Sequence, residues 1–299
     1  MGLALACLVA LAAPARALES QLTIGGAAIQ VHVGAGERRL TDAQLLGWVE
    51  GAARAVSAYF GRFPVKTLDL TIGVDDRRGV HGGVTRGWPA PNIHIKISHE
   101  CPPEVLARDW VLVHEMVHTS FPNVDRDKHA WAEEGLSTYV EPWARVRAGQ
   151  LTREHVWADL AHDMPQGDPE PGDQGLDHTP TWGRTYWGGA QFWMLADVEL
   201  REKSGGRLGL EDALRAIQAA GGDVTVDWPL EQSLAVADKA LGLAVLVPLH
   251  DRMKAAPAPV DLPDLWKRLG IKVDGERATF DDAAPLAAVR RQIERGPAR

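Results

Sequence analysis

The first third of the chain carries the period-two pattern of β-strands. Residues 67–74 and 92–97 alternate apolar and polar side chains, as strands with one buried face do. The segment between them, residues 79–91, is rich in Gly and Pro and predicts an irregular connection. We therefore expect residues 18–100 to form a strand-rich lobe around a small sheet.

One helix is predicted inside this lobe. Apolar residues recur at helical spacing over residues 45–60, Thr41 ahead of them is a favourable N-cap, and Gly61 ends the run.

From residue 101 onward the hydrophobic spacing changes to that of helices. Residues 164–182 differ, because they are rich in Asp, Gly and Pro and predict a long loop. Such a loop is either functional or a plain surface insertion. The predicted helices cover residues 104–119, 130–148, 152–163, 186–203 and 210–220, with shorter ones near 229–241 and 262–269.

The composition is compatible with one α+β domain over residues 18–299. The chain of 299 residues is 45% hydrophobic, which is enough for a full-sized core. Its formal net charge of −8, without a Lys/Arg run, argues against nucleic acid or an anionic membrane as a partner. The sequence divides this domain into the strand-rich lobe at 18–100, a helix pair at 101–149 and a helical lobe at 150–299.

Residues 1–17 have the composition of an export signal. Residues 2–13 are almost wholly apolar, and Ala15-Arg16-Ala17 is a small-x-small cleavage site. The run is too short for a membrane span, which needs roughly 20 residues, so stable membrane insertion is not expected. Cleavage would leave Cys101 as the single cysteine, without an internal disulfide. We expect a periplasmic or secreted protein, with a buried first helix as the alternative.

The strongest chemical signal is the run His114-Glu115-Met116-Val117-His118. On a helix, residues four apart lie on one face, so both imidazoles can reach one metal ion at ~2.0–2.1 Å. Glu115 lies about 100° round the helix, where its carboxylate can hold an activated water. The alternative is a pair of core histidines bonded to the backbone.

A third ligand is expected from the acidic pair Glu133 and Glu134, which begins 15 residues after His118. Catalytic zinc takes three protein ligands and keeps one position open. The two glutamates are adjacent, so only one of them can face the metal. An acidic pair near a helix N-terminus is also favourable without any metal.

The two motifs together resemble the gluzincin (MA-like) zinc metallopeptidases. His-Glu-x-x-His followed by Trp131-Ala132-Glu133-Glu134-Gly135 is most similar to the membrane alanyl and glycyl aminopeptidase branch, although the spacer is shorter here. The resemblance covers about 40 residues and implies Glu134 as the third ligand of one Zn²⁺ per chain. It also implies a thermolysin-like zincin domain, with a small mixed sheet, a helical lobe and an active-site cleft between them.

A second resemblance to these aminopeptidases lies downstream. Thr185-Tyr186-Trp187-Gly188-Gly189-Ala190 looks like their Tyr-x-x-Gly segment, which implies that the Tyr186 hydroxyl stabilises the oxyanion of the reaction. An aromatic residue at a helix start can also be plain packing. Thr138, one turn after Glu134, is a candidate to support a ligand histidine or simply bonds to its own helix.

The expected function is zinc-dependent hydrolysis of peptide bonds in a peptide or protein substrate, with Glu115 and Tyr186 as catalytic residues. The family's aminopeptidases bind the substrate's amino group through a Glu-Asn strand, and no Glu-Asn pair occurs here. Aminopeptidase specificity is therefore not indicated. The alternatives are a zinc hydrolase of a non-peptide substrate and a catalytically silent peptide-binding module of peptidase descent.

Overall fold

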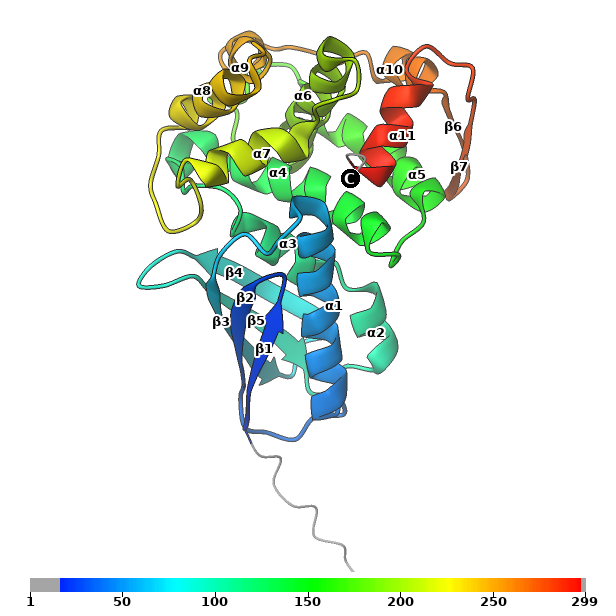
Figure 1. Cartoon of the computed structure of the whole chain (residues 1–299). Helices are drawn as coiled ribbons and strands as arrows, with labels where there is room; N and C mark the ends of the chain where they lie inside the picture. Colours follow the sequence, from blue (N-terminus) through cyan, green and yellow to red (C-terminus); the bar gives the residue numbers. More distant parts are fainter. Residues whose placement is uncertain (1–16, 297–299) are drawn as a thin grey trace, which may run out of the picture.

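The structure is a computed structural model that describes residues 17–296. The predicted export signal, Ala17 excepted, lies outside the described residues. Two lobes are stacked on each other, a sheet with one long helix below and a larger helical assembly above (Figure 1). The predicted divisions near residues 100 and 150 fall in connections between elements.

The first lobe is built on a five-stranded mixed sheet with the strand order β1-β2-β3-β5-β4. The neighbouring strands β2, β3 and β5 run parallel, and the edge strands β1 and β4 pair antiparallel with their neighbours. Both strands predicted from alternation are present. The strands are β1 (Leu18–Ile24), β2 (Ala27–Val33), β3 (Thr67–Asp75), β4 (Val80–Arg86) and β5 (Asn92–Ser98).

Strand β4 corrects the expectation of an irregular connection at residues 79–91. It pairs with β5, and its register shifts at an irregularity between His81 and Val84. Gly82 and Gly83 occupy that shift, so the strand lacks the alternation that a search for period-two patterns needs. Because β4 is an edge strand, one of its sides stays available to the neighbouring lobe.

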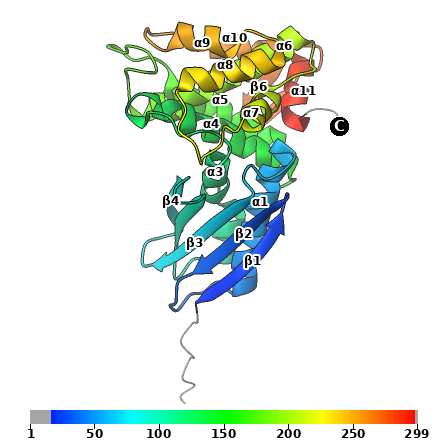
Figure 2. The same ribbon diagram turned by 60° about the vertical axis from the view of Figure 1, so that its left-hand side comes forward.

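Helix α1 (Asp42–Phe60) covers one face of the sheet (Figure 2). The Thr41 side chain accepts the backbone N–H of Gln44, and the Gln44 side chain accepts the N–H of Thr41, which completes a capping box. Gly61 ends the helix with a φ of 82°, in the left-handed region that glycine tolerates. The predicted helix and both of its ends are confirmed.

The predicted helix 104–119 is wrong as a single element. The structure contains α2 (Pro103–Arg108) and α3 (Val111–His118), with a break at Asp109. The Asp109 carboxylate accepts the backbone N–H groups of Val111 and Leu112, each at 3.1 Å. A side chain that bonds the first amides of α3 starts a new helix there. The short α3 lies where the two lobes meet (Figures 1 and 2).

The helical lobe contains more helices and strands than the sequence pattern predicts. Helix α4 merges two helical stretches across a kink at His129. Helix α9, the hairpin of β6 and β7, and helix α11 were not predicted, whereas α5, α7, α8 and α10 agree with the predicted runs. Within the described residues no helix is both long and apolar enough to cross a membrane. The elements are α4 (Arg126–Arg147), α5 (Arg153–Asp163), the 3-10 turn η1 (Met164–Gly167), the π turn η2 (Arg184–Gly188), α6 (Gly189–Ser204), α7 (Leu210–Ala219), α8 (Leu230–Leu241), α9 (Leu246–Met253), α10 (Leu262–Leu269), β6 (Ile271–Asp274), β7 (Arg277–Phe280) and α11 (Ala287–Arg295).

Candidate metal centre

Helices α3 and α4 bring His114, His118 and Glu134 together, and we call these three residues the triad. Glu134 Oε2 lies 3.2 Å from His114 Nε2 and 3.5 Å from His118 Nε2. Two ligand atoms of a tetrahedral zinc site with bonds of ~2.05 Å are about 3.3 Å apart. The separations therefore fit one ion shared by the three donors, and two imidazoles with a carboxylate are a donor set that catalytic zinc uses.

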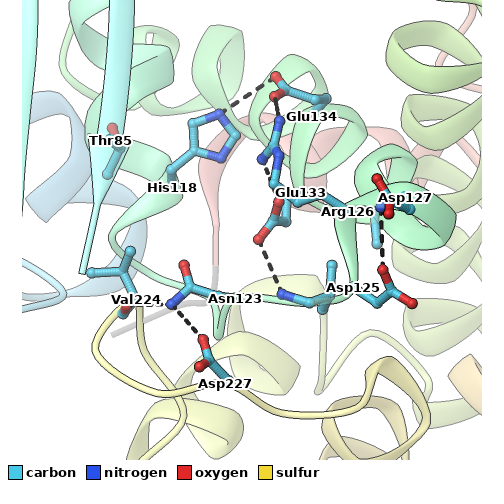
Figure 3. A network of polar contacts seen from close by, with 12 residues as sticks. Thr85, His118, Asn123, Asp125, Arg126, Asp127, Glu133, Glu134, Val224 and Asp227 are labelled. Carbon is cyan, nitrogen blue, oxygen red and sulfur yellow. Dashed lines mark hydrogen bonds and ion pairs between the residues drawn. The ribbon is translucent and has the colours of Figure 1, made fainter. Parts of the chain in front are cut away.

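The adjacent residues Glu133 and Glu134 make different contacts. Glu133 turns away from the histidines, and its carboxylate accepts the backbone N–H of Val124 at 3.2 Å. Arg126 contacts both carboxylates, donating to Glu133 Oε2 and, at 2.7 Å, to Glu134 Oε1 (Figure 3). The guanidinium thus holds the oxygen of Glu134 that does not face the histidines. Sequence reasoning missed Arg126, whose position seven residues before Glu133 carries no motif.

The electrostatic environment differs among the three residues of the triad: the hydrogen bond to Glu134 outweighs burial and raises the pKa of His118, whereas the pKa of His114 is lowered. Burial raises the pKa of Glu134, but hydrogen bonds from His114, His118 and Arg126 outweigh burial and hold this pKa far below its usual range. Burial is the main reason that the pKa of His114 is lowered. A lowered pKa keeps the His114 imidazole neutral, which is the form that coordinates a metal.

Glu115 is held by strand β4. The Thr85 hydroxyl lies 2.7 Å from Glu115 Oε2 and 2.8 Å from the Glu115 carbonyl oxygen, so its proton can be donated to either. A Cβ on Gly83 would lie 2.5 Å from Glu115 Oε1, so the absence of a side chain there makes room for the carboxylate. Thr85 and Gly83 were not predicted as site residues, because β4 was not predicted as a strand.

Tyr186 lies in the π turn η2, on the His114 side of the triad. Its ring centroid is 6.4 Å from that of His114. Burial, followed by the negative charge of Glu134, raises the pKa of the Tyr186 hydroxyl. The protonated hydroxyl is therefore retained as a donor near the triad. Irregular π turns of this kind occur frequently at functional sites.

A backbone contact between helices sets the position of Tyr186. A Cβ built on Gly135 would lie 2.3 Å from the carbonyl carbon of Gly189, and one built on Gly189 would lie 2.1 Å from the Trp131 carbonyl oxygen. Only glycine permits this approach of α6 to α4. The Gly that follows Glu134 in the sequence motif thus has a packing role, which brings η2 to the metal centre.

Thr138 hydrogen-bonds within its own helix. Its hydroxyl is 2.8 Å from the carbonyl oxygen of Glu134, one turn earlier in α4. This is the local bond that the sequence left as the alternative to a histidine contact. A support role for a ligand histidine remains a prediction, with Thr138 lining a cavity beside His114.

Two cavities border the triad. The strand-side cavity, of about 620 Å³, contains Glu115, His118 and Glu134 and is walled by β4. The tryptophan-side cavity, of about 580 Å³, contains His114 and Tyr186. Among the described residues four large apolar side chains are strongly exposed, and all four line these cavities: Val84 and Trp88 the first, Trp110 and Trp182 the second.

Comparison with known proteins supports the fold. No protein-family model matches the sequence, and no curated protein matches it significantly. Solved structures do match: an aminopeptidase N family protein from Idiomarina loihiensis has a TM-score of 0.66 at 12% identity, with 86% of this chain and 50% of that chain covered. The M1 zinc metallopeptidase from Deinococcus radiodurans has a TM-score of 0.55 at 13% identity, with 84% of this chain and 53% of that chain covered.

A variant of the Deinococcus protein bound to a Tyr-Ser-Ala substrate matches with the same TM-score of 0.55 and 14% identity. This chain spans about half the length of each of these structures. It has the mixed α+β fold of M1 zinc metallopeptidases, which agrees with the predicted gluzincin resemblance at the level of the fold. The likeness does not select the aminopeptidase branch that the sequence motif favoured.

Proposed function

We propose that this chain is a zinc-dependent peptidase. The observation that carries the proposal is the meeting of the triad with Glu115 at the boundary of two open cavities. His114, His118 and Glu134 would hold one Zn²⁺. Zinc at this position supplies Lewis acidity, which activates water and polarises a carbonyl group.

The residues around the triad supply the proton transfers. Glu115 takes a proton from the attacking water as the bond from oxygen to the carbonyl carbon forms. It then delivers that proton to the amine nitrogen as the C–N bond breaks. The Thr85 hydroxyl keeps the Glu115 carboxylate over the strand-side cavity. The Tyr186 hydroxyl donates to the carbonyl oxygen while that oxygen gains negative charge.

The cavities support a peptide as the substrate. An edge strand such as β4 can pair with an extended peptide through backbone hydrogen bonds. Exposed Trp88 and Val84 in one cavity beside the triad, and Trp110 and Trp182 in the other, offer apolar surface to side chains on both sides of the cleaved bond. We therefore propose cleavage within peptides that carry bulky apolar residues.

In a catalytically silent peptide-binding module, Glu115 would have no role. A closed structural zinc site needs four protein ligands and no proton acceptor. Here Glu115 lies in the same open cavity as two residues of the triad, and a hydroxyl from another element holds it. These contacts favour a hydrolase over a binding module.

The test is zinc content and peptide hydrolysis, measured side by side for the wild type, Glu134→Ala and Glu115→Gln. We expect chelator-sensitive cleavage of a peptide library by the wild type, with zinc lost from the triad in Glu134→Ala. Glu115→Gln should keep that zinc and lose cleavage. Wild-type protein that holds zinc at the triad but cleaves no peptide would overturn the proposal.

We further propose that the protein acts after export, in the periplasm or outside the cell, because of the composition of residues 1–17. Determination of the N-terminus of the mature protein tests this. A start at Leu18 is expected, and retention of the leader in the cytoplasm would contradict it.

A further inference from the structure

A second group of metal-ligating side chains lies on another part of α4. It consists of His129 at the kink of α4, Asp177 in the loop 164–182, and His250 on α9, and we call it the second cluster. All three residues are buried, with exposed fractions of 5%, 7% and 2%. The cluster joins three segments that are far apart in the sequence.

The distances in the second cluster match those of the triad. His129 Nε2 lies 3.4 Å from Asp177 Oδ2, and His250 Nε2 lies 3.4 Å from Asp177 Oδ1. A charged hydrogen bond between these groups would be about 2.7–2.9 Å long. The observed separations are instead close to the ~3.3 Å between two ligands of one tetrahedral zinc ion.

The two ring nitrogens of His129 are buried and poorly satisfied. Neither of its buried ring nitrogens makes a hydrogen bond of good geometry to a described residue, and Nε2 has only the 3.4 Å ion-pair contact with Asp177. Its backbone also leaves helical geometry, with φ −118° and ψ 17°, at the position where the two parts of α4 join. Buried polar groups are nearly always satisfied, and a metal ion would satisfy the nitrogen that faces Asp177.

Neighbouring groups orient the cluster. The Trp131 indole N–H donates to Asp177 Oδ1 at 3.0 Å, and the Trp131 ring stacks on His250 with centroids 5.8 Å apart. Partners of this kind fix the direction of metal ligands. Lys128 Nζ lies 3.6 Å from Asp177 Oδ2, and its side chain is 42% exposed, so it can leave that oxygen without disturbing the core.

A route for an ion leads from the surface to His129. An open cavity of about 540 Å³ is lined by Lys128 and His129. Its wall also carries three acidic residues, Asp125, Asp227 and Glu231. Their negative charge favours the approach of a cation, and the cavity can supply the water that completes a four-coordinate site.

We propose that His129, Asp177 and His250 bind a second divalent transition-metal ion, with Zn²⁺ as the matching ion, which ties α4, the loop 164–182 and α9 together. The inference rests on the second cluster alone and does not require peptidase activity. Its role is to hold the helical lobe, because its three ligands come from three separate segments of that lobe.

The test is the number of zinc ions bound by chelator-stripped protein during titration with Zn²⁺ alone. Two per chain are expected for the wild type, one for Glu134→Ala and one for Asp177→Asn. The Asn side chain keeps the acceptor for Trp131 and removes the charge. His32→Gln removes an exposed histidine of the sheet lobe and should leave two. One ion in the wild type and none in Glu134→Ala would overturn the proposal.

A second measurement applies if a cluster variant folds poorly. In Glu134→Ala, saturating Zn²⁺ should raise the melting temperature by roughly 5–10 °C, because the ion binds only the folded state. Lys128→Ala should bind the second ion at least as tightly as the wild type does. The same measurement is made on Glu134→Ala combined with Lys128→Ala. If Zn²⁺ changes the melting temperature of neither variant, the second cluster is an ion-pair network without a metal.

Discussion

The triad and the second cluster have nearly the same donors, two imidazoles and a carboxylate, and very different surroundings. The triad faces two cavities and has Glu115, Thr85 and Tyr186 around it. The second cluster packs against the Trp131 ring and borders one cavity through His129, and among the described residues no carboxylate other than Asp177 hydrogen-bonds to its side chains. A shared donor set thus suits the same metal, whereas access and the neighbouring groups determine what the site does.

The two carboxylates are alike electrostatically. The pKa of Glu134 and that of Asp177 both lie far below the usual range, because donors from the neighbouring imidazoles outweigh burial. Arg126 and Trp131 provide one further donor each. The proposed catalysis must therefore depend on features that only the triad has, and the following changes separate those features.

The largest effect is expected from Glu115→Gln. Glutamine keeps the shape and an acceptor for the Thr85 hydroxyl but cannot take up a proton. Hydrolysis should fall by about 10²–10⁴-fold with zinc at the triad unchanged, as kcat and elemental analysis would show. Asp177→Asn is the matched change in the second cluster, and its effect on kcat should be far smaller. Equal losses in the two variants would erase the distinction between the sites.

Tyr186→Phe should lower kcat by about 10²–10³-fold, or ~2.7–4 kcal/mol, with little change in KM, because the hydroxyl acts on charge that develops during the reaction. Steady-state kinetics on a cleaved peptide measures it. Tyr59→Phe is the control, since the buried Tyr59 hydroxyl has no hydrogen-bond partner among the described residues. If KM rises and kcat does not change, the Tyr186 hydroxyl contributes to substrate binding instead.

The stability of the protein should depend on pH through the ionisation of Glu141, which lines the tryptophan-side cavity. Burial raises the pKa of Glu141 from 4.5 to about 7, against the opposing effect of Arg145. Folding thus favours the protonated form, so its contribution is complete below pH 4.5 and is lost as the pH rises to about 7. The free energy of unfolding should fall by about 3 kcal/mol over this window. Glu141→Gln should flatten the change in denaturant titrations, and an unchanged pH profile would argue against this assignment.

Arg126→Met should weaken zinc binding at the triad by about 10–100-fold, because Glu134 Oε1 loses the donor that holds it. Competition with a chromogenic chelator measures the affinity. The affinity of the second cluster should not change. Unaltered affinity at the triad would show that the histidines alone orient Glu134.

Gly83→Ala should give the smallest change, about tenfold in kcat, because the new methyl group must displace the Glu115 carboxylate. Since that carboxylate is the end of a flexible side chain, little stability should be lost. Gly47→Ala, a helical site with open space around it, is the control for adding a methyl group. A stability loss without a kcat effect would mean that β4 moves instead of Glu115.

Local patterns determined much of the fold and the triad. Spacing of four residues on one helix places His114 and His118 on the same face whatever surrounds them. The Thr41 cap, the Gly61 end and the alternation in β3 and β5 are equally local, and the structure contains all of them. Strands β6 and β7 were not predicted, because four residues in each are too few for a period to emerge. Helices α9 and α11 were not predicted either, although α10 is equally short.

The amino-acid sequence alone thus predicts the mixed α+β class, the two facing histidines and an acidic partner nearby. Tertiary packing places Glu134 rather than Glu133 toward them, because the Val124 amide holds Glu133 elsewhere and Arg126 bonds only the oxygen of Glu134 that faces away from the histidines. Tertiary packing also brings together the second cluster, whose residues lie 48 and 73 positions apart along the chain. Such contacts follow from the packing of whole helices, as at Gly135 and Gly189, and no local period encodes them.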